Sequence, residues 1–152
     1  MSQYKPNSII PLFETFCRKN QVDGKTVEVE ICEVPLQLKV ATTPRSQAKG
    51  FMGATQKPKE NEGMLFVYDG EQPLSFWMKD VPFALDIIFF DGEANYIGHE
   101  TMNPFDNSPD HLLPRYFSKK PARFAVEVEA GWCDKHLKER RVSIFKVRQS
   151  VV

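Results

Sequence analysis

The apolar pattern of residues 61–98 constrains the fold of this chain more than any other feature. Three short apolar runs occur there, MLFVY, LSFWM and ALDIIFF, and turn-forming residues separate them. Short apolar and aromatic runs between turn signals are typical of buried β-strands. The pairs Asp69-Gly70 and Asp91-Gly92 fit hairpin turns, because both residue types tolerate a positive φ. The segment therefore predicts several short strands that fold back on one another.

The rest of the chain extends this pattern. Thr43 and Pro44 suit the N-cap and first position of a short helix, with Gly50 as the left-handed residue that ends it. A second short helix is predicted at 132–138, and the four prolines of residues 102–121 indicate a long loop. Strands are predicted at residues 25–33, 36–41, 64–68, 74–78, 84–90, 94–101, 122–129 and 142–148. We therefore expect a mostly β fold: a single small barrel-like domain of about eight short strands with one or two short helices.

The N-terminal residues differ in character from the rest. Residues 1–24 are polar and hold one apolar cluster, so we predict an N-terminal arm at 1–24 and a β domain at 25–152. The arm either caps its own domain or docks on a partner protein or a second copy of the chain, because an exposed apolar cluster at a terminus marks a contact surface. The candidate contact residues are Ile9, Ile10, Leu12, Phe13 and Phe16.

Composition excludes several classes of partner. The chain has 20 Lys and Arg residues and 20 Asp and Glu residues, so no net charge attracts it to nucleic acid or to an anionic membrane. It has no apolar run of bilayer length and no apolar signal-peptide region at its start. Its three cysteines and three histidines share no ligand spacing, so we expect no metal site and no cofactor. The expected location is the cytoplasm or a virion.

Several short motifs, in order, resemble a known family. They are Arg45 with Gly50-Phe51-Met52, Gly63-Met64-Leu65-Phe66, Phe76-Trp77-Met78-Lys79, Leu85-Asp86-Ile87-Ile88-Phe89, and Glu127 with Ala130-Gly131. The set is similar to the domain of unknown function 192 family from about residue 27 to residue 147. The resemblance implies a compact β-barrel-like domain and implies no enzymatic activity, cofactor or substrate.

The chain departs from that family pattern in two places. The family usually has a Gly-Asp pair before its final strand, whereas this chain has residues 138–141, Lys-Glu-Arg-Arg. Many members begin with a secretion or lipoprotein signal, and this chain begins with the polar arm instead. Its location and partners are therefore expected to differ from those of typical members.

Five side chains are candidates for a ligand site or a structural network: Arg45, Trp77, Lys79, Asp86 and Glu127. Asp86 interrupts an apolar strand, so it either accepts backbone N–H groups, pairs with Arg45 or Lys79, or acts as an acid or base. Arg45 suits a salt bridge to Asp86 or Glu127, or an anionic ligand. Trp77 faces outward if Phe76 and Met78 face the core, toward a ligand, a partner or the long loop.

Three functions remain open from the sequence. The first is a non-catalytic binding or assembly module, such as an accessory structural component of a phage virion, which the arm and the proline-rich loop favour. The second is a small-molecule or carbohydrate binder that uses Trp77, Arg45 and Asp86. The third is a hydrolase-like enzyme, which needs Asp86 and Glu127 to face one cavity. No catalytic sequence signature is present, so a non-catalytic role is favoured.

Overall fold

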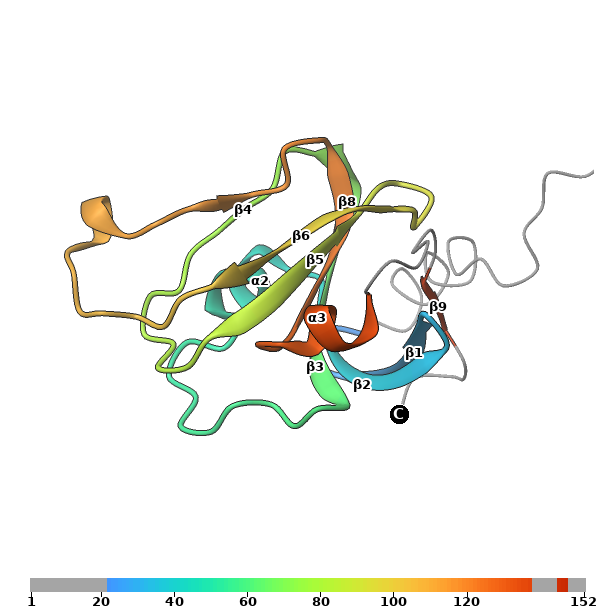
Figure 1. The fold of residues 1–152 in the computed structure, drawn as a ribbon. Helices are drawn as coiled ribbons and strands as arrows, with labels where there is room; N and C mark the ends of the chain where they lie inside the picture. Colours follow the sequence, from blue (N-terminus) through green and yellow to red (C-terminus); the bar gives the residue numbers. More distant parts are fainter. Residues whose placement is uncertain (1–21, 138–144, 148–152) are drawn as a thin grey trace, which may run out of the picture.

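The computed structural model describes residues 22–137 and 145–147, and its fold is mostly β, as predicted (Figure 1). Within these ranges, two short α-helices and one 3-10 turn accompany the strands. The elements are β1 (Thr26–Ile31), β2 (Val34–Ala41), α2 (Pro44–Lys49), β3 (Glu62–Gln72), β4 (Ser75–Phe76), β5 (Leu85–Phe90), β6 (Tyr96–Met102), η1 (Asp110–Leu112), β7 (Tyr116–Phe117), β8 (Ala122–Glu129), α3 (Trp132–His136) and β9 (Phe145–Val147).

Most of the described strands form one seven-stranded sheet in the order β6-β5-β8-β3-β2-β1-β9. Neighbouring strands pair antiparallel, except that β2 and β3 pair in parallel. β4 and β7 form a separate two-stranded ribbon. The sheet has β6 at one edge and β9 at the other, so it is open, and the predicted barrel-like character is only loose.

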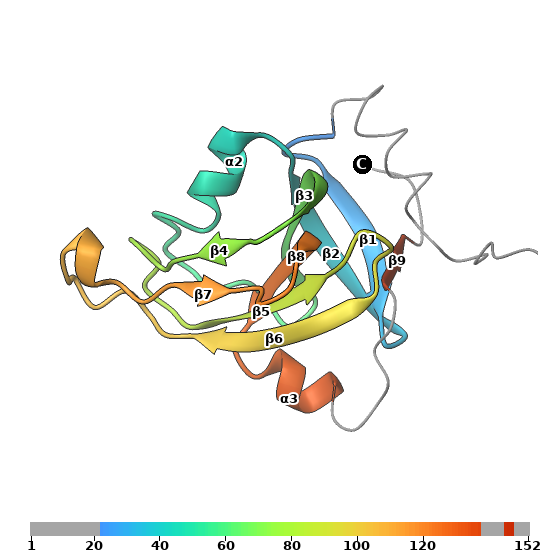
Figure 2. The ribbon, with the colours of Figure 1, turned by 90° about the horizontal axis from the view of Figure 1, so that it is seen from above.

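The two faces of the sheet support two apolar clusters, because successive side chains of a strand point to opposite faces. One cluster includes Ile88, Val126, Val128 and α3 residue Trp132. The other includes Ile87, Phe89, Ala125 and Phe76 of β4. Figure 2 shows α2 and α3 on opposite sides of the sheet. A residue on β5 or β8 is therefore assigned to a face by its position along the strand.

The short helix α2 begins at the predicted position. Thr43 is its N-cap, Pro44 is its first residue, and the Thr43 side chain accepts a hydrogen bond from the backbone N–H of Ser46 at 3.1 Å. Gly50 ends the helix with φ 46° and ψ −125°, so its φ is positive as predicted but its ψ lies outside the left-handed helical region. These caps fix where the chain leaves α2, directly over the sheet.

One predicted hairpin turn is confirmed and the other is wrong. Asp91 begins the turn between β5 and β6, and its carboxylate accepts the backbone N–H groups of Glu93 and Asn95. Residues 69–70, in contrast, lie inside β3. The pairing of β3 with β8 shifts register between Val67 and Gln72, so the Asp-Gly pair is accommodated as an irregularity within the strand and the chain does not reverse.

Three residues assigned to the predicted arm pack against the β domain. Val22 is fully buried, and the Gly24 N–H donates to the Val40 carbonyl at 2.7 Å. Asp23 accepts hydrogen bonds from the Thr42 N–H at 2.7 Å and the Ser46 hydroxyl at 2.6 Å. The apolar cluster at Ile9, Ile10, Leu12, Phe13 and Phe16, like residues 138–141, lies outside the described residues, so the docking arm stays a prediction.

Candidate functional site

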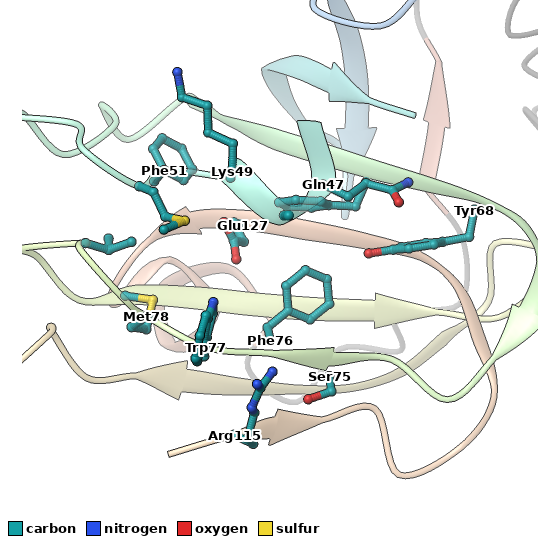
Figure 3. A pocket seen from close by; sticks show the side chains of 15 residues that line it. Gln47, Lys49, Phe51, Tyr68, Ser75, Phe76, Trp77, Met78, Arg115 and Glu127 are labelled. Atoms are coloured by element: carbon teal, nitrogen blue, oxygen red, sulfur yellow. The ribbon is translucent and has the colours of Figure 1, made fainter. Parts of the chain in front are cut away.

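A cavity of about 450 Å³ lies between α2, the seven-stranded sheet and the separate strand β4 (Figure 3). The helix and the turn after it supply one wall, β3 and β8 supply the floor, and β4 with the start of the loop after it supplies the opposite wall. Most of the lining is apolar. Its aromatic and thioether side chains are Phe51, Phe66, Phe76, Trp77, Met52 and Met78.

Glu127 is the ionisable group at the floor of this cavity. It lies on β8 opposite Ile87 of β5 and Met64 of β3, and its side chain is 4% exposed. No side chain or backbone N–H of the described residues donates a hydrogen bond to its carboxylate. Burial raises the pKa of Glu127 to about 8, because the charged form is poorly solvated there. At neutral pH the group is therefore mostly a neutral acid.

Two neighbours shape the space around Glu127. Gly50 has no side chain, and a Cβ at its position would lie 3.8 Å from Oε1 of Glu127 and 3.7 Å from the Phe66 ring. Figure 3 shows the Tyr68 hydroxyl and the Glu127 carboxylate both directed into the cavity. Burial, and then the negative charge of Glu127, raise the pKa of the Tyr68 phenol above its ordinary value. Tyr68 is therefore a neutral hydroxyl beside the acid.

Trp77 contributes one wall and contacts the long loop. Phe76 and Met78 are buried on either side of it and Trp77 is half-buried, as the strand alternation predicts. The Arg115 guanidinium lies over the Trp77 ring, 4.4 Å from its centroid, and the Lys79 ammonium lies 5.7 Å from it. Trp77 thus faces both the cavity and the loop.

Lys79 does not pair with Asp86 but with an acid of the long loop. Its Nζ lies 2.9 Å from a carboxylate oxygen of Asp110. That hydrogen bond raises the pKa of Lys79 above its ordinary value. Because both side chains are substantially exposed, this pair positions the loop and contributes little to stability.

Asp86 is buried on the opposite face of the sheet from Glu127. It pairs with Val128 across β5 and β8, whereas Glu127 pairs with Ile87, so the two carboxylates point to opposite faces. Asp86 accepts hydrogen bonds from the Thr101 hydroxyl at 2.7 Å, the Gly131 N–H at 3.1 Å and the Cys133 N–H at 2.9 Å. Asp86 therefore fixes the start of α3, and the condition for a paired-carboxylate hydrolase is not met.

Arg45 is not part of the cavity. It lies exposed on α2, and within residues 22–137 it forms no ion pair with Asp86 or Glu127. The suggested salt bridges of Arg45 are therefore wrong. A different residue of α2 contacts the sheet, since the Gln47 amide donates to the Val67 carbonyl of β3 at 2.8 Å.

Among the lining residues that the sequence did not indicate as part of a site are Gln47, Tyr68 and Arg115. Tyr68 ends an apolar run just before an Asp-Gly pair, and a polar tip at the end of a buried strand is a usable signal. Gln47 lies inside the predicted short helix without a distinguishing pattern. Arg115 lies in a loop between prolines, where no local pattern predicts its stacking on Trp77.

Within residues 22–137 and 145–147, no three His, Cys, Asp or Glu side chains lie close enough together to hold a metal ion. No helix in these same ranges combines the length and the apolar character needed to span a bilayer.

Solved structures share this fold. The chain matches a candidate transcription regulator from Sinorhizobium meliloti 1021 with a TM-score of 0.66 at 21% identity, over 81% of this chain and 92% of the other. It also matches a protein of unknown function from Novosphingobium aromaticivorans DSM 12444 with a TM-score of 0.68 at 22% identity, over 82% and 85% of the two chains. At these identities the likeness concerns the fold. No curated protein matches the chain.

A family model covers most of the chain. The model named DUF192, described as an uncharacterized ACR, matches residues 19–141. The match begins before Val22, in agreement with the packing of that residue in the core. It includes the strand motifs around Gly63, Asp86 and Glu127. The chain belongs to the DUF192 family.

Proposed function

We propose that this protein binds a small organic molecule in the cavity between α2 and the sheet. The observation that carries the proposal is Glu127, a buried carboxyl group that reaches the cavity without a hydrogen-bond partner among the described residues. Buried polar groups are normally hydrogen-bonded, so one that is left open in an aromatic cavity supports a bound partner. The cavity volume, about 450 Å³, is in the range of small-molecule sites.

Binding is favoured over hydrolysis because of the position of the carboxylates. Acid–base hydrolysis of the kind considered from the sequence uses two carboxyl groups on one cavity. Here the lining contains Glu127, and Asp86 is engaged by three donors on the other face of the sheet. Of the residues suggested for a binding site, Trp77 and Glu127 line the cavity, whereas Arg45 and Asp86 do not.

A ligand screen against a blocked variant tests the proposal. Ala48 is an exposed residue of α2 on the cavity lining, so Ala48→Trp fills the opening without disturbing the core. We expect some members of a small-molecule set to raise the melting temperature of the full chain and to lose this effect in Ala48→Trp. Glu93→Trp, at an exposed turn outside the cavity, serves as the control and should keep the response. Equal responses in all three proteins would place the binding elsewhere, and no response in any would reject the proposal.

A second proposal is an assembly role, which two exposed apolar residues support. Leu112 of η1 is 63% exposed and Phe117 of β7 is 53% exposed. The segment between β6 and β7 projects from the sheet (Figure 1). Large apolar side chains with this exposure are typical of contact surfaces when they cluster. If they join copies of this chain, Leu112→Ser with Phe117→Ser lowers the mass measured by light scattering during size exclusion. An unchanged mass would reject this surface for self-association. A place in a virion stays a prediction from the arm.

A further inference from the structure

We propose that the ligand of this cavity is an organic ammonium ion, a compact apolar body that carries one protonated amine placed against Glu127. This inference rests on the proposed binding function and names the chemical class of its ligand. Three features of the cavity carry it: an unpartnered carboxylate, the position of the protein's own cations, and the aromatic character of the walls.

Among the residues that the structure describes, the carboxylate has no cationic partner and no hydrogen-bond donor. Glu127 is 4% exposed, and no N–H, hydroxyl or ion-pair partner within residues 22–137 reaches its oxygens. Gly50 leaves open the space next to Oε1. An ionised carboxylate in such surroundings is costly unless a counter-ion is brought to it. A ligand ammonium supplies both the charge and up to three N–H donors.

The cations of the cavity lie at its rim and not at its floor. Lys49 of α2 and Arg115 of the long loop are exposed, and neither contributes to the pKa of Glu127. In Figure 3 the Lys49 side chain extends away from Glu127, and the Arg115 guanidinium lies against Trp77. The protein therefore leaves the place beside Glu127 open to a cation from outside.

The walls favour a cation with an apolar body over a polyhydroxylated ligand. Phe51, Phe66, Phe76 and Trp77 line the cavity, and aromatic faces attract cations that have left water. A sugar needs several donors and acceptors arranged around its ring. The NH₂ group of Gln47 already donates to the Val67 and Ala41 carbonyls, so its amide oxygen remains as an acceptor. The other polar side chains of the lining, apart from the two rim cations, are Glu127, Tyr68 and the exposed Ser75.

Binding of an ammonium ion is expected to release a proton, because Glu127 is protonated in the free protein. The group is mostly protonated at neutral pH, so an ammonium ion that pairs with the carboxylate displaces a proton to solvent. The affinity for the amine therefore rises with pH, by up to about tenfold per unit, until Glu127 is ionised near pH 8. The other ionisable groups on the lining are Tyr68, whose pKa is raised, and the rim residues Lys49 and Arg115. A neutral ligand shows no such dependence.

A matched pair of probes tests the inference on the full chain. Benzylamine and benzyl alcohol have nearly the same shape and differ in charge, so titration calorimetry at pH 6, 7 and 8 compares them directly. We expect benzylamine to bind at least tenfold more tightly than benzyl alcohol at pH 8, with proton release seen in buffers of different ionisation heat. Glu127→Gln removes this preference, and Glu93→Gln, an exposed control, keeps it.

The outcomes separate the two proposals. If benzyl alcohol or another neutral compound binds the cavity as tightly as benzylamine, or if the affinity for benzylamine does not change with pH, the ammonium class is rejected and the binding function stands. If neither the probes nor the wider set binds, both proposals are rejected. The pH series on the unaltered chain decides the inference even if Glu127→Gln fails to fold.

Discussion

Glu127 and Asp86 are two buried carboxyl groups on neighbouring strands, and they differ in the hydrogen bonds that their oxygens accept. Asp86 receives three hydrogen bonds from the chain itself, whereas Glu127 receives none from the described residues. The first pattern is that of a structural residue, since a satisfied buried carboxylate stabilises its surroundings. The second is typical of binding sites, where a perturbed group awaits a partner.

The stability of the protein should fall with pH because of Glu127. Its pKa is about 8 in the folded chain against 4.5 for a free carboxyl group, so the folded state binds the proton more tightly. This contribution is present in full below pH 4.5 and is lost progressively as the pH rises to about 8. Glu127→Gln lacks this contribution. As the pH rises through that interval, the free energy of unfolding of the variant therefore increases relative to that of the parent by about 1 kcal/mol per pH unit. Urea unfolding of both proteins at pH 5, 6.5 and 8 measures the difference, and parallel curves would contradict it.

Removing Asp86 should destabilise the fold without affecting the cavity. Asp86→Ala leaves the Thr101 hydroxyl and the Gly131 and Cys133 N–H groups without their acceptor, at a cost of about 3 kcal/mol or more. Asp86→Asn costs less, because its amide oxygen still accepts from the backbone while its NH₂ group donates to Thr101. Chemical denaturation ranks the three proteins. Equal stability of the Ala variant and the parent would show that these bonds contribute nothing.

The role of such a residue could be predicted only where the residues around it in the sequence form a clear pattern. The burial of Asp86 was predictable, because one acid interrupts an apolar strand, and acceptance of backbone N–H groups was among the alternatives. Which donors it meets depends on Thr101 and Gly131, which the topology brings from other elements. For Glu127 the alternation places the side chain on a face, but the cavity over that face comes from α2 and β4, far away in the sequence.

Among the elements, β3 and β8 approach closely at Gly63. A Cβ at this position would lie 2.1 Å from the backbone carbonyl oxygen of Glu127. This clash can be relieved only if the two strands move apart. Gly63→Ala is therefore expected to lose several kcal/mol, about the range of an overpacked core. Gly70→Ala is a matched control on the same strand, since nothing lies within 4 Å of its Cβ position. Thermal unfolding compares them, and a normal melting temperature for Gly63→Ala would refute the close approach.

The turn between β1 and β2 is strained and can be relieved. Cys32 and Glu33 have φ of 54° and 65°, which L-residues adopt at a cost of about 1 kcal/mol each. Glu33 is exposed, so Glu33→Gly should raise the free energy of unfolding by about 1 kcal/mol through relief of this strain. The higher entropy of the unfolded chain with glycine offsets part of this gain. Glu33→Gln removes the charge but keeps the strain, and it should match the parent in denaturant. If Gln stabilises as much as Gly, charge and not φ is the cause.

Secondary elements were predictable to different degrees for a physical reason. Alternation identified β1, β2 and β8, and a continuous apolar run identified β5, because the side chains of these strands pack in the apolar clusters. The predicted strand at 74–78 is reduced to Ser75–Phe76, because its partner β7 is a two-residue segment of the long loop. Pairing partners of this kind carry no local signature.

For the whole molecule, the packing of Val22 places residues 22–24 inside the folded unit. A chain that begins at Gln21 keeps the buried Val22 and the hydrogen bonds of Asp23, whereas one that begins at Lys25 loses them. The shorter chain should be less stable by about 2 kcal/mol or more, chiefly from the apolar surface of Val22. Guanidinium denaturation of the two truncations measures this difference. Identical midpoints would mean that residues 22–24 do not belong to the domain.

The class of fold was predictable from the sequence and its closure was not. Short apolar runs with turn signals are shared by barrels and by open sheets. What decides here is that β6 and β9 lie at opposite edges of the sheet and do not pair. The parallel pairing of β2 with β3 likewise depends on the path of residues 42–61 over the sheet, which carries α2 to the cavity.

The position of β8 between β3 and β5 determines at what point of synthesis the two parts of the sheet can join. Before residue 122 leaves the ribosome, β1 and β2 can pair, β2 can pair with β3, and β5 can pair with β6. Of the described strands, β8 is the one that pairs with both groups, and it has not yet emerged. Each nascent half then exposes a strand edge, the surface by which incomplete chains aggregate or recruit chaperones. Glu127 lies on the joining strand, so the floor of the cavity forms in the same event that joins the two groups of strands.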